Sequence, residues 1–276
     1  MVMKKKYLKL ISTDSIGWLG KPEQFIYLYK DYFKDGTFDG VEMIAFKPVS
    51  RLKKFISILD QHNIPTISFH SKTGGENRLP AQYGIIMTIV NFFIFGVEDL
   101  TLNFKDIEFL SHTPYVENKK IKDFIVNNKP KTLWIENHLY GRKGIEDAKN
   151  QIIDYRKKGI DAHGMLDLYH LLAKVPTKEL VKTWSKIVAE ASNYLKWFSG
   201  IHFPIGSHKD DSLPIEQITD EMLELFGKKI VPHLDRVVIE NIQENLGLFF
   251  STTKMLEKQK KRNKINFQRL KKTGIL

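Results

Sequence analysis

The sequence has no cysteine and no long apolar run, and each absence excludes a class of protein. Without cysteine, the 276 residues can form no disulfide, thiolate metal site or cysteine nucleophile. The longest apolar run, from Ile85 to Val97, is interrupted by polar residues and is shorter than the roughly 20 residues that cross a bilayer. The basic start of the chain has its short apolar stretch broken by Lys9 and does not fit a signal peptide. We therefore expect a cytoplasmic protein with no membrane partner.

Positive charge is concentrated near the C-terminus. The chain carries 43 Lys and Arg against 32 Asp and Glu, a formal net charge of +11. The segment from Lys254 to Lys272 contains nine of these basic residues and one acid, Glu257, so most of the excess charge lies there. A solvated terminal helix explains this pattern, and contact with a nucleic-acid backbone or another anionic surface is the alternative.

Short runs rich in β-branched and aromatic residues alternate with segments of helical periodicity. Eight runs predict strands: Tyr7–Ser12, Gly40–Phe46, Ile64–His70, Asp99–Phe104, Lys131–Glu136, Ile160–Asp167, Tyr194–His202 and Asp235–Glu240. The segments between and after them predict helices: Pro22–Phe33, Arg51–His62, Ala81–Phe95, Asn118–Asn127, Gly144–Lys158, Thr177–Ser192, Ile215–Lys229 and Gly247–Lys264. Repeated strand–helix units are typical of a parallel sheet covered by helices.

Eight such units predict an α/β fold of the (β/α)8 TIM-barrel type. The chain length is close to the roughly 250 residues of such barrels. With no break in composition, we expect one domain over residues 1–276, with the barrel over about 5–247 and a C-terminal helix and basic tail over 248–276. A doubly wound open sheet is the competing architecture, but no G-x-G-x-x-G turn follows an early strand.

Polar side chains stand at the ends of four consecutive predicted strands. Strand five ends in Glu136, strand six in Asp167, strand seven in His202 and strand eight in Glu240. The C-terminal ends of barrel strands meet at one mouth, where such enzymes carry their chemistry. Three carboxylates and an imidazole gathered there would repel one another's charges unless a cation neutralised them. Oxygen-rich ligands with one nitrogen suit Mn²⁺, Mg²⁺ or Co²⁺ better than a closed zinc site.

These elements resemble the xylose-isomerase-like barrel superfamily, in particular its sugar isomerase and epimerase branch. The resemblance covers the whole barrel and is carried by short motifs in order: Gly40-Val-Glu42, Ile67-Ser-Phe-His70, Ile135-Glu136-Asn137, Asp167-Leu-Tyr-His170, His202 and Ile239-Glu240-Asn241. The resemblance implies that Glu136, Asp167, His202 and Glu240 bind a divalent metal. Manganese is the first choice, with Mg²⁺, Co²⁺ and Zn²⁺ as alternatives. It also implies that both glutamates move protons and that His170 lies beside the substrate.

The function expected on this basis is a metal-dependent isomerase or epimerase of a sugar, sugar phosphate or cyclitol. The metal would stabilise an enediolate as a Lewis acid while one glutamate removes a proton and the other returns it. Four residues are expected to line the substrate site: His70, Trp18, His208 and Asp210. Small carbohydrates are the expected partners, and formation of a homo-oligomer stays open.

A second branch of the same superfamily, the type IV apurinic endonucleases, is the alternative function. Its three zinc ions require more histidines, and the chain departs from its pattern in two places. Strand four is expected to end at Leu102-Asn103, where the endonuclease has His, and His112 lies too far along to replace it. After strand seven the order is His208-Lys-Asp210 rather than Asp-x-His. A barrel that binds without catalysis is the third hypothesis, and the remaining histidines (62, 112, 138, 163 and 233) are assigned no role.

Overall fold

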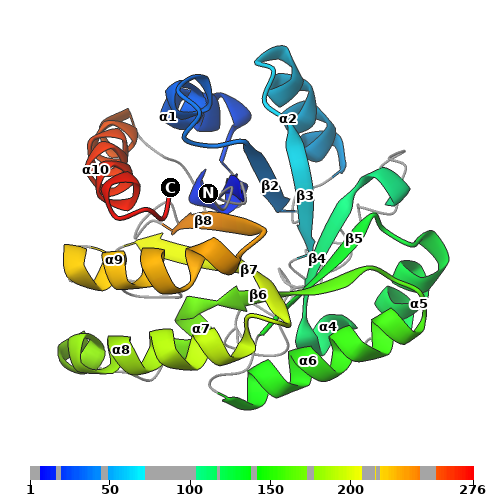
Figure 1. Cartoon of the computed structure of the whole chain (residues 1–276). Coiled ribbons are helices and arrows are strands. Elements are labelled where there is room, and N and C mark those ends of the chain that lie inside the picture. The colour runs from blue at the N-terminus through cyan, green and yellow to red at the C-terminus, as the bar shows by residue number, and fades with distance from the viewer. Residues whose placement is uncertain are drawn as a thin grey trace, which may run out of the picture.

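The computed structural model of the chain is a closed barrel of eight parallel strands in chain order, as predicted (Figure 1). It describes residues 7–16, 20–44, 49–71, 104–116, 119–137, 142–172, 177–206, 215, 218–242 and 253–276. Each strand pairs with the next, and β8 pairs with β1 to close the barrel. The strands are β1 Leu8–Ser12, β2 Gly40–Ile44, β3 Thr66–Ser71, β4 Glu108–His112, β5 Thr132–Glu136, β6 Ala162–Asp167, β7 Phe198–Gly206 and β8 Arg236–Ile242.

Helices surround the barrel and bury its outer face. They are α1 Pro22–Lys34, α2 Val49–Gln61, α4 Thr113–Val116, α5 Lys119–Asn128, α6 Arg142–Lys157, α7 Leu168–Leu172, α8 Thr177–Tyr194, α9 Asp220–Lys229 and α10 Thr253–Lys272. Short 3-10 turns lie at Thr13–Ile16, Phe104–Asp106 and Val231–His233. None of the described helices is both long and apolar enough to cross a membrane. The predicted helix Ala81–Phe95 lies outside the described residues.

The prediction for strand four was wrong. The strand between β3 and β5 is Glu108–His112, which pairs in register with both neighbours. Most of the predicted range, Asp99–Phe104, lies outside the described residues, and Phe104 begins a 3-10 turn. The true strand escaped detection because it begins with a glutamate and ends with Ser111 and His112, leaving only two apolar residues between them. Strand four therefore ends in a histidine.

A buried ion pair between Arg236 and Glu108 fills the interior of the barrel at the N-terminal ends of the strands. Arg236 is 2% exposed, pairs with the Glu108 carboxylate, and stacks over the Trp134 ring at 4.0 Å from the ring centre. The Trp134 indole N–H also donates to Glu108 Oε2 at 2.9 Å. Gly200 leaves room for this ring, since a Cβ there would lie 2.8 Å from it. The polar start of β4 thus has a structural partner inside the barrel.

Breaking this ion pair is expected to cost far more stability than removing an exposed charge beside it. Arg236→Leu leaves Glu108 charged and nearly buried, and one-sided removal from such pairs costs about 3–5 kcal/mol. Lys131→Leu is the matched control, because Lys131 Nζ lies 4.0 Å from the same carboxylate but is 60% exposed. Its loss should cost about 0–1 kcal/mol. Chemical denaturation of both variants measures the difference, and equal losses would contradict this account.

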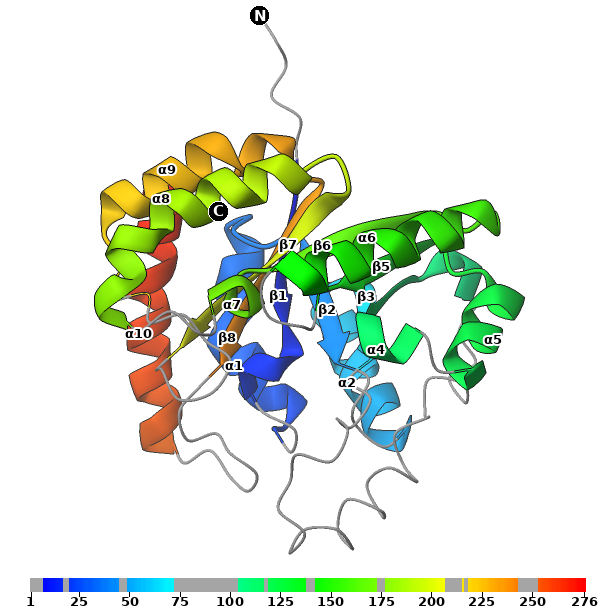
Figure 2. The same ribbon diagram turned by 90° about the horizontal axis from the view of Figure 1, so that it is seen from below.

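The C-terminal helix α10 closes the ring of helices between α9 and α1 and runs along the barrel (Figures 1 and 2). A buried polar network joins it to β8. The Asn241 side-chain amide donates to Tyr29 Oη at 3.0 Å and to Asn263 Oδ1 at 2.6 Å. Gln259 donates to the same Tyr29 oxygen at 3.2 Å. The inner face of α10 is therefore fixed to the barrel, although its composition is strongly basic.

Candidate metal and proton-transfer site

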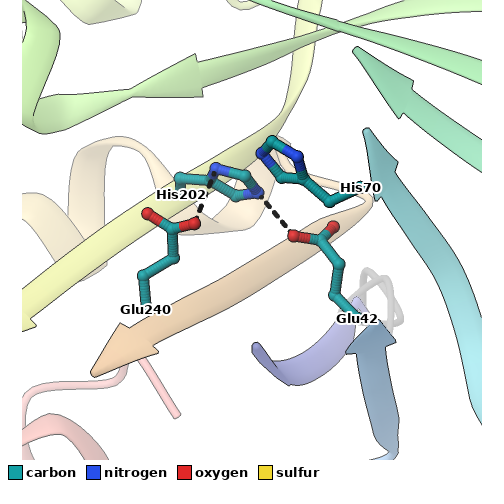
Figure 3. Close-up of side chains that lie close together, drawn as sticks. All are labelled: Glu42, His70, His202 and Glu240. Carbon is teal, nitrogen blue, oxygen red and sulfur yellow. Dashed lines mark ion pairs between the residues drawn. The ribbon is translucent and has the colours of Figure 1, made fainter. Parts of the chain in front are cut away.

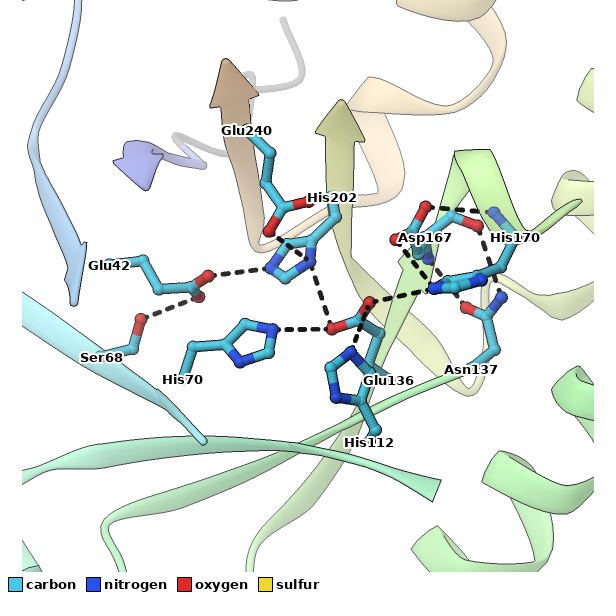
Figure 4. Close-up of polar contacts among 10 residues, drawn as sticks. All are labelled: Glu42, Ser68, His70, His112, Glu136, Asn137, Asp167, His170, His202 and Glu240. Atoms are coloured by element: carbon cyan, nitrogen blue, oxygen red, sulfur yellow. Dashed lines mark hydrogen bonds and ion pairs between the residues drawn. The ribbon is translucent and has the colours of Figure 1, made fainter. Parts of the chain in front are cut away.

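The C-terminal ends of seven strands and the helix after β6 bring ten polar side chains together (Figure 4). The four strand-end residues predicted from the sequence are among them: Glu136 on β5, Asp167 on β6, His202 on β7 and Glu240 on β8. All four are buried. The apolar runs that precede them form the barrel wall, and the strand register aligns Asp167 with His202.

One group within this site consists of Glu42, His70, His202 and Glu240 (Figure 3). His202 lies between the two carboxylates: its Nε2 is 3.0 Å from Glu42 Oε1, and its Nδ1 is 3.6 Å from Glu240 Oε1. The His70 ring stacks against it at 5.4 Å between ring centres. The group offers one potential ligand atom from each residue, all within 4.8 Å of one another.

Glu136 is the centre of the site. Its Oε2 lies 3.1 Å from His70 Nε2 and 3.3 Å from His202 Nδ1. Its Oε1 lies 3.3 Å from His112 Nε2 and 3.9 Å from His170 Nε2. One carboxylate from β5 therefore contacts four imidazoles, which arrive from β3, β4, α7 and β7.

Asp167 is held by the residues around the start of α7. Its backbone N–H donates to Asn137 Oδ1 at 2.8 Å, and its Oδ1 accepts from the His170 backbone N–H at 3.3 Å. Its Oδ2 lies 3.4 Å from His170 Nε2. The sequence Asp167-Leu-Tyr-His170 thus folds back on itself and brings both side chains to the same side of Glu136.

Burial and mutual contact shift the pKa values of these groups in different directions. Burial raises the pKa of Asp167 to about 6, and the nearby Glu136 adds to that rise. Burial also acts on Glu136, but His112 and His202 outweigh it and hold its pKa well below the ordinary value. Burial lowers the pKa of His202, but the carboxylates of Glu240, Glu136 and Glu42 outweigh burial and raise this pKa well above its ordinary value. The site is therefore a buried cluster in which an ionised Glu136 lies beside a positively charged His202.

The donor set fits a divalent cation. Three overlapping groups each bring potential ligand atoms within 4.8 Å, and Glu136 or His70 is shared between them: Glu42, His70, His202 and Glu240; His70, His112 and Glu136; Glu136, Asp167 and His170. Carboxylate and imidazole ligands suit Mn²⁺, Zn²⁺ and related ions. A cation would also offset the burial and the nearby Glu136 charge that raise the pKa of Asp167.

The Asp167 pKa predicts how the metal-free protein responds to pH. Because the folded pKa of about 6 exceeds the ordinary aspartate value of 3.8, ionisation of Asp167 opposes folding. This cost is absent below about pH 4, grows between pH 4 and 6, and is complete above pH 6, where about two pKa units correspond to roughly 3 kcal/mol. Asp167→Asn should therefore stabilise the metal-free protein at pH 7 and have little effect at pH 4.

Denaturation of both proteins in a chelator at pH 4 and pH 7 measures this effect. Adding Mn²⁺ at pH 7 supplies the control, since the wild type should then become the more stable protein. An equal stability difference at the two pH values would contradict the assignment of Asp167 as a strained carboxylate.

The remaining sequence predictions for the site have mixed outcomes. His70 is buried beside Glu136 and His202, and His170 lies between Glu136 and Asp167. Three of the expected substrate residues, Trp18, His208 and Asp210, lie outside the described residues.

Two residues of the cluster were missed. His112 was left without a role because strand four was misplaced, and the structure corrects this by placing it at the end of β4 in contact with Glu136. Glu42 belongs to a motif that supported the resemblance but was given no function. The available signal was a lone charged residue in an otherwise apolar strand, Gly-Val-Glu42-Met-Ile, although this does not show which way the side chain faces.

Comparison with known proteins supports the fold. No protein-family model and no curated protein sequence matches the chain. Among solved structures, the apo form of the 3-keto-D-glucoside 4-epimerase YcjR from E. coli aligns with 95% of this chain and 100% of its own, at 9% identity and a TM-score of 0.52. A D-psicose 3-epimerase in the presence of D-fructose aligns with 95% of this chain and 99% of its own, at 11% identity and a TM-score of 0.45.

The IolI protein with a bound zinc atom aligns with 97% of this chain and 96% of its own, at 12% identity and a TM-score of 0.48. At such low identities the comparison shows a shared fold only. This conclusion rests on the epimerase from E. coli, whose TM-score is 0.52. The chain therefore has the closed parallel barrel that the sequence predicted, and it shares this fold with the epimerase from E. coli.

Proposed function

We propose that this chain is a cytoplasmic, divalent-metal-dependent sugar isomerase or epimerase that acts by proton transfer between two glutamates. The observation that carries the proposal is that two glutamates contact the same atom, His202 Nδ1. Glu136 Oε2 lies 3.3 Å from it and Glu240 Oε1 lies 3.6 Å from it. These carboxylates come from β5 and β8, which are not neighbours in the barrel. The fold shared with an epimerase gives independent support.

Glu136, Asp167, His202 and Glu240 would hold the metal, with manganese as the first choice and Mg²⁺, Co²⁺ or Zn²⁺ as alternatives. When bound, the ion supplies Lewis acidity that makes the C–H bond beside a sugar carbonyl more acidic. Glu136 and Glu240 are the bases: one takes the proton from that carbon, and the other delivers a proton to the opposite face or the adjacent position. A positioned general acid or base contributes about 10²–10⁴-fold to such a step.

His170 is suited to binding the substrate, because its Nε2 faces both Glu136 and Asp167. A substrate oxygen that replaces one of these contacts would be held beside the proton-transfer carboxylates. His70, Trp18, His208 and Asp210 remain the proposed substrate-binding residues. A ketose or a related carbohydrate is the substrate class that this chemistry requires.

The second candidate function is that of a type IV apurinic endonuclease, and one observation favours it. Strand β4 ends in His112, which joins His70 and Glu136 in a further group with metal-ligand spacing. This removes one of the two departures from the endonuclease pattern. The other, the order His208-Lys-Asp210, lies outside the described residues. In this function the basic outer face of α10 would be a contact for DNA.

Metal stoichiometry separates these functions. Elemental analysis of tag-free protein should give about one Mn, Mg or Co per chain for the isomerase, which then converts members of a ketose panel. Two or three zinc ions, with cleavage of DNA containing an abasic site, would overturn the isomerase in favour of the nuclease. Protein that takes up no metal even after loading would contradict both and leave a barrel that binds without catalysis.

His112→Ala sharpens this experiment. In the isomerase, His112 is outside the proposed ligand set, so the variant should keep one ion per chain. In the nuclease it is a ligand, and the variant should lose one zinc and most DNA cleavage. His163→Ala is the control, because His163 pairs with Asp161 and packs on Trp134, away from this cluster.

A further inference from the structure

Glu42 is a fully buried carboxylate that the proposed reaction does not use. It lies in the middle of β2 and is 0% exposed. Its two oxygens have different partners: Oε1 lies 3.0 Å from His202 Nε2, and Oε2 accepts a hydrogen bond from Ser68 Oγ at 3.1 Å (Figures 3 and 4). A buried charge is costly, so its presence beside His202 requires an explanation.

The two nitrogens of His202 face different surroundings. Nδ1 faces the carboxylates of Glu136 and Glu240, which belong to the proposed ligand set. Nε2 faces Glu42. An imidazole that binds a metal through one nitrogen keeps its proton on the other, and a carboxylate commonly fixes that proton and the ring orientation. Glu42 occupies the position of that carboxylate.

Glu42 is itself held in position and in its ionised form. Ser68 on β3 fixes one oxygen through its hydroxyl group. Burial raises the pKa of Glu42, but His202, then His70 and Arg236, outweigh it and lower that pKa below its ordinary value. Arg236 in turn is paired with Glu108. Acidic and basic side chains therefore alternate through the barrel interior in the order Glu108, Arg236, Glu42 and His202.

We infer that Glu42 is a positioning residue that holds His202 Nε2–H and so aims Nδ1 at the metal. The contact of Glu42 with His202 is an ion pair at 3.0 Å that lacks the geometry of a hydrogen bond. A metal held by Nδ1 would require that nitrogen to be deprotonated, so the one proton of the ring would be on Nε2, opposite Glu42. The inference rests on the proposed metal site, but it is independent of which substrate the site takes.

Metal titration of purified full-length protein tests this role. Isothermal titration with Mn²⁺ and Co²⁺ compares wild type with Glu42→Leu and Glu42→Gln. Loss of such a partner of a metal ligand weakens metal affinity by about 10–100-fold, and we expect that for Glu42→Leu. Glu42→Gln keeps an acceptor oxygen for Nε2–H and should restore part of the affinity.

Two controls separate positioning from structural damage and from direct ligation. Tyr155→Phe removes a buried hydrogen bond to the Val116 carbonyl, outside the cluster around His202, and should leave the metal affinity within about threefold of wild type. The visible absorption spectrum of the Co²⁺-loaded protein reports the ligand set. It should be the same in Glu42→Leu at saturating metal as in wild type, because the ligands are unchanged.

Several results would overturn the inference. Wild-type metal affinity in Glu42→Leu would do so, as would an equal loss in Tyr155→Phe. A changed Co²⁺ spectrum would make Glu42 a ligand rather than a positioning residue. Failure of wild-type protein to bind metal would instead refute the proposed function, so the two failures are distinguishable.

Discussion

Glu240→Gln is expected to abolish most sugar turnover while the protein remains folded. The amide cannot accept a proton, and loss of one general base or acid costs about 10²–10⁴-fold in kcat. Because Glu240 is also a proposed ligand, the Kd for Mn²⁺ should rise in the same variant. Turnover at saturating metal separates the two effects, since the loss that persists there belongs to proton transfer.

Solvent deuterium gives a second readout for this variant. In wild type, product formed in D2O should carry deuterium from the returning glutamate. If Glu136 alone still removes a proton, Glu240→Gln should exchange deuterium into one epimer without converting it. Glu224→Gln is the matched control, because Glu224 lies on the surface of α9 and pairs with Lys228. Wild-type turnover by the Glu240→Gln variant would exclude the two-base mechanism.

Glu136→Gln is expected to have the larger effect, because it changes both the metal and the surrounding histidines. This carboxylate contacts the rings of His70, His112 and His202 within 3.3 Å and that of His170 at 3.9 Å. We expect kcat to fall by about 10⁴-fold or more. The metal content should fall well below one ion per chain. Elemental analysis and a ketose assay measure both quantities.

The same substitution tests the pKa assignments. Glu136 is among the groups that raise the pKa of His202, so its neutralisation should lower that pKa. NMR titration of His202 in metal-free protein measures the change, and Glu224→Gln again serves as control. An unchanged His202 titration would contradict the central position assigned to Glu136.

The outcome for the strands shows what the sequence could and could not predict. In strands five to eight an apolar run leads to one polar residue, so Glu136, Asp167, His202 and Glu240 were found directly. The predicted ends of β7 and β8 were too early, because these strands continue to Gly206 and Ile242. Strand β4 lacks this apolar run because it begins with Glu108. The Glu108 side chain lies inside the barrel and pairs with Arg236, which is far away in the sequence. No local pattern identifies such a partner, and the error removed His112 from the candidate site.

Glu42 was missed for a related reason. A glutamate on a predicted strand gives no sign of whether it faces the barrel axis or the helices. Its assignment requires the register that places it beside Ser68 and the distance to His202 on the opposite side of the barrel. Motif order was enough to indicate the fold and four potential ligands, but the contacts between strands had to come from the structure.

The alternation of side chains along β8 links the basic helix to the chemistry of the barrel. Glu240 points into the cluster, while its neighbour Asn241 points outward to Tyr29 and Asn263. A shift of α10 would therefore displace the backbone that carries Glu240, the proposed proton-transfer carboxylate. By composition this helix resembles an appendage, but it supports the wall of the proposed active site from outside, and a substitution on its buried face should reduce turnover.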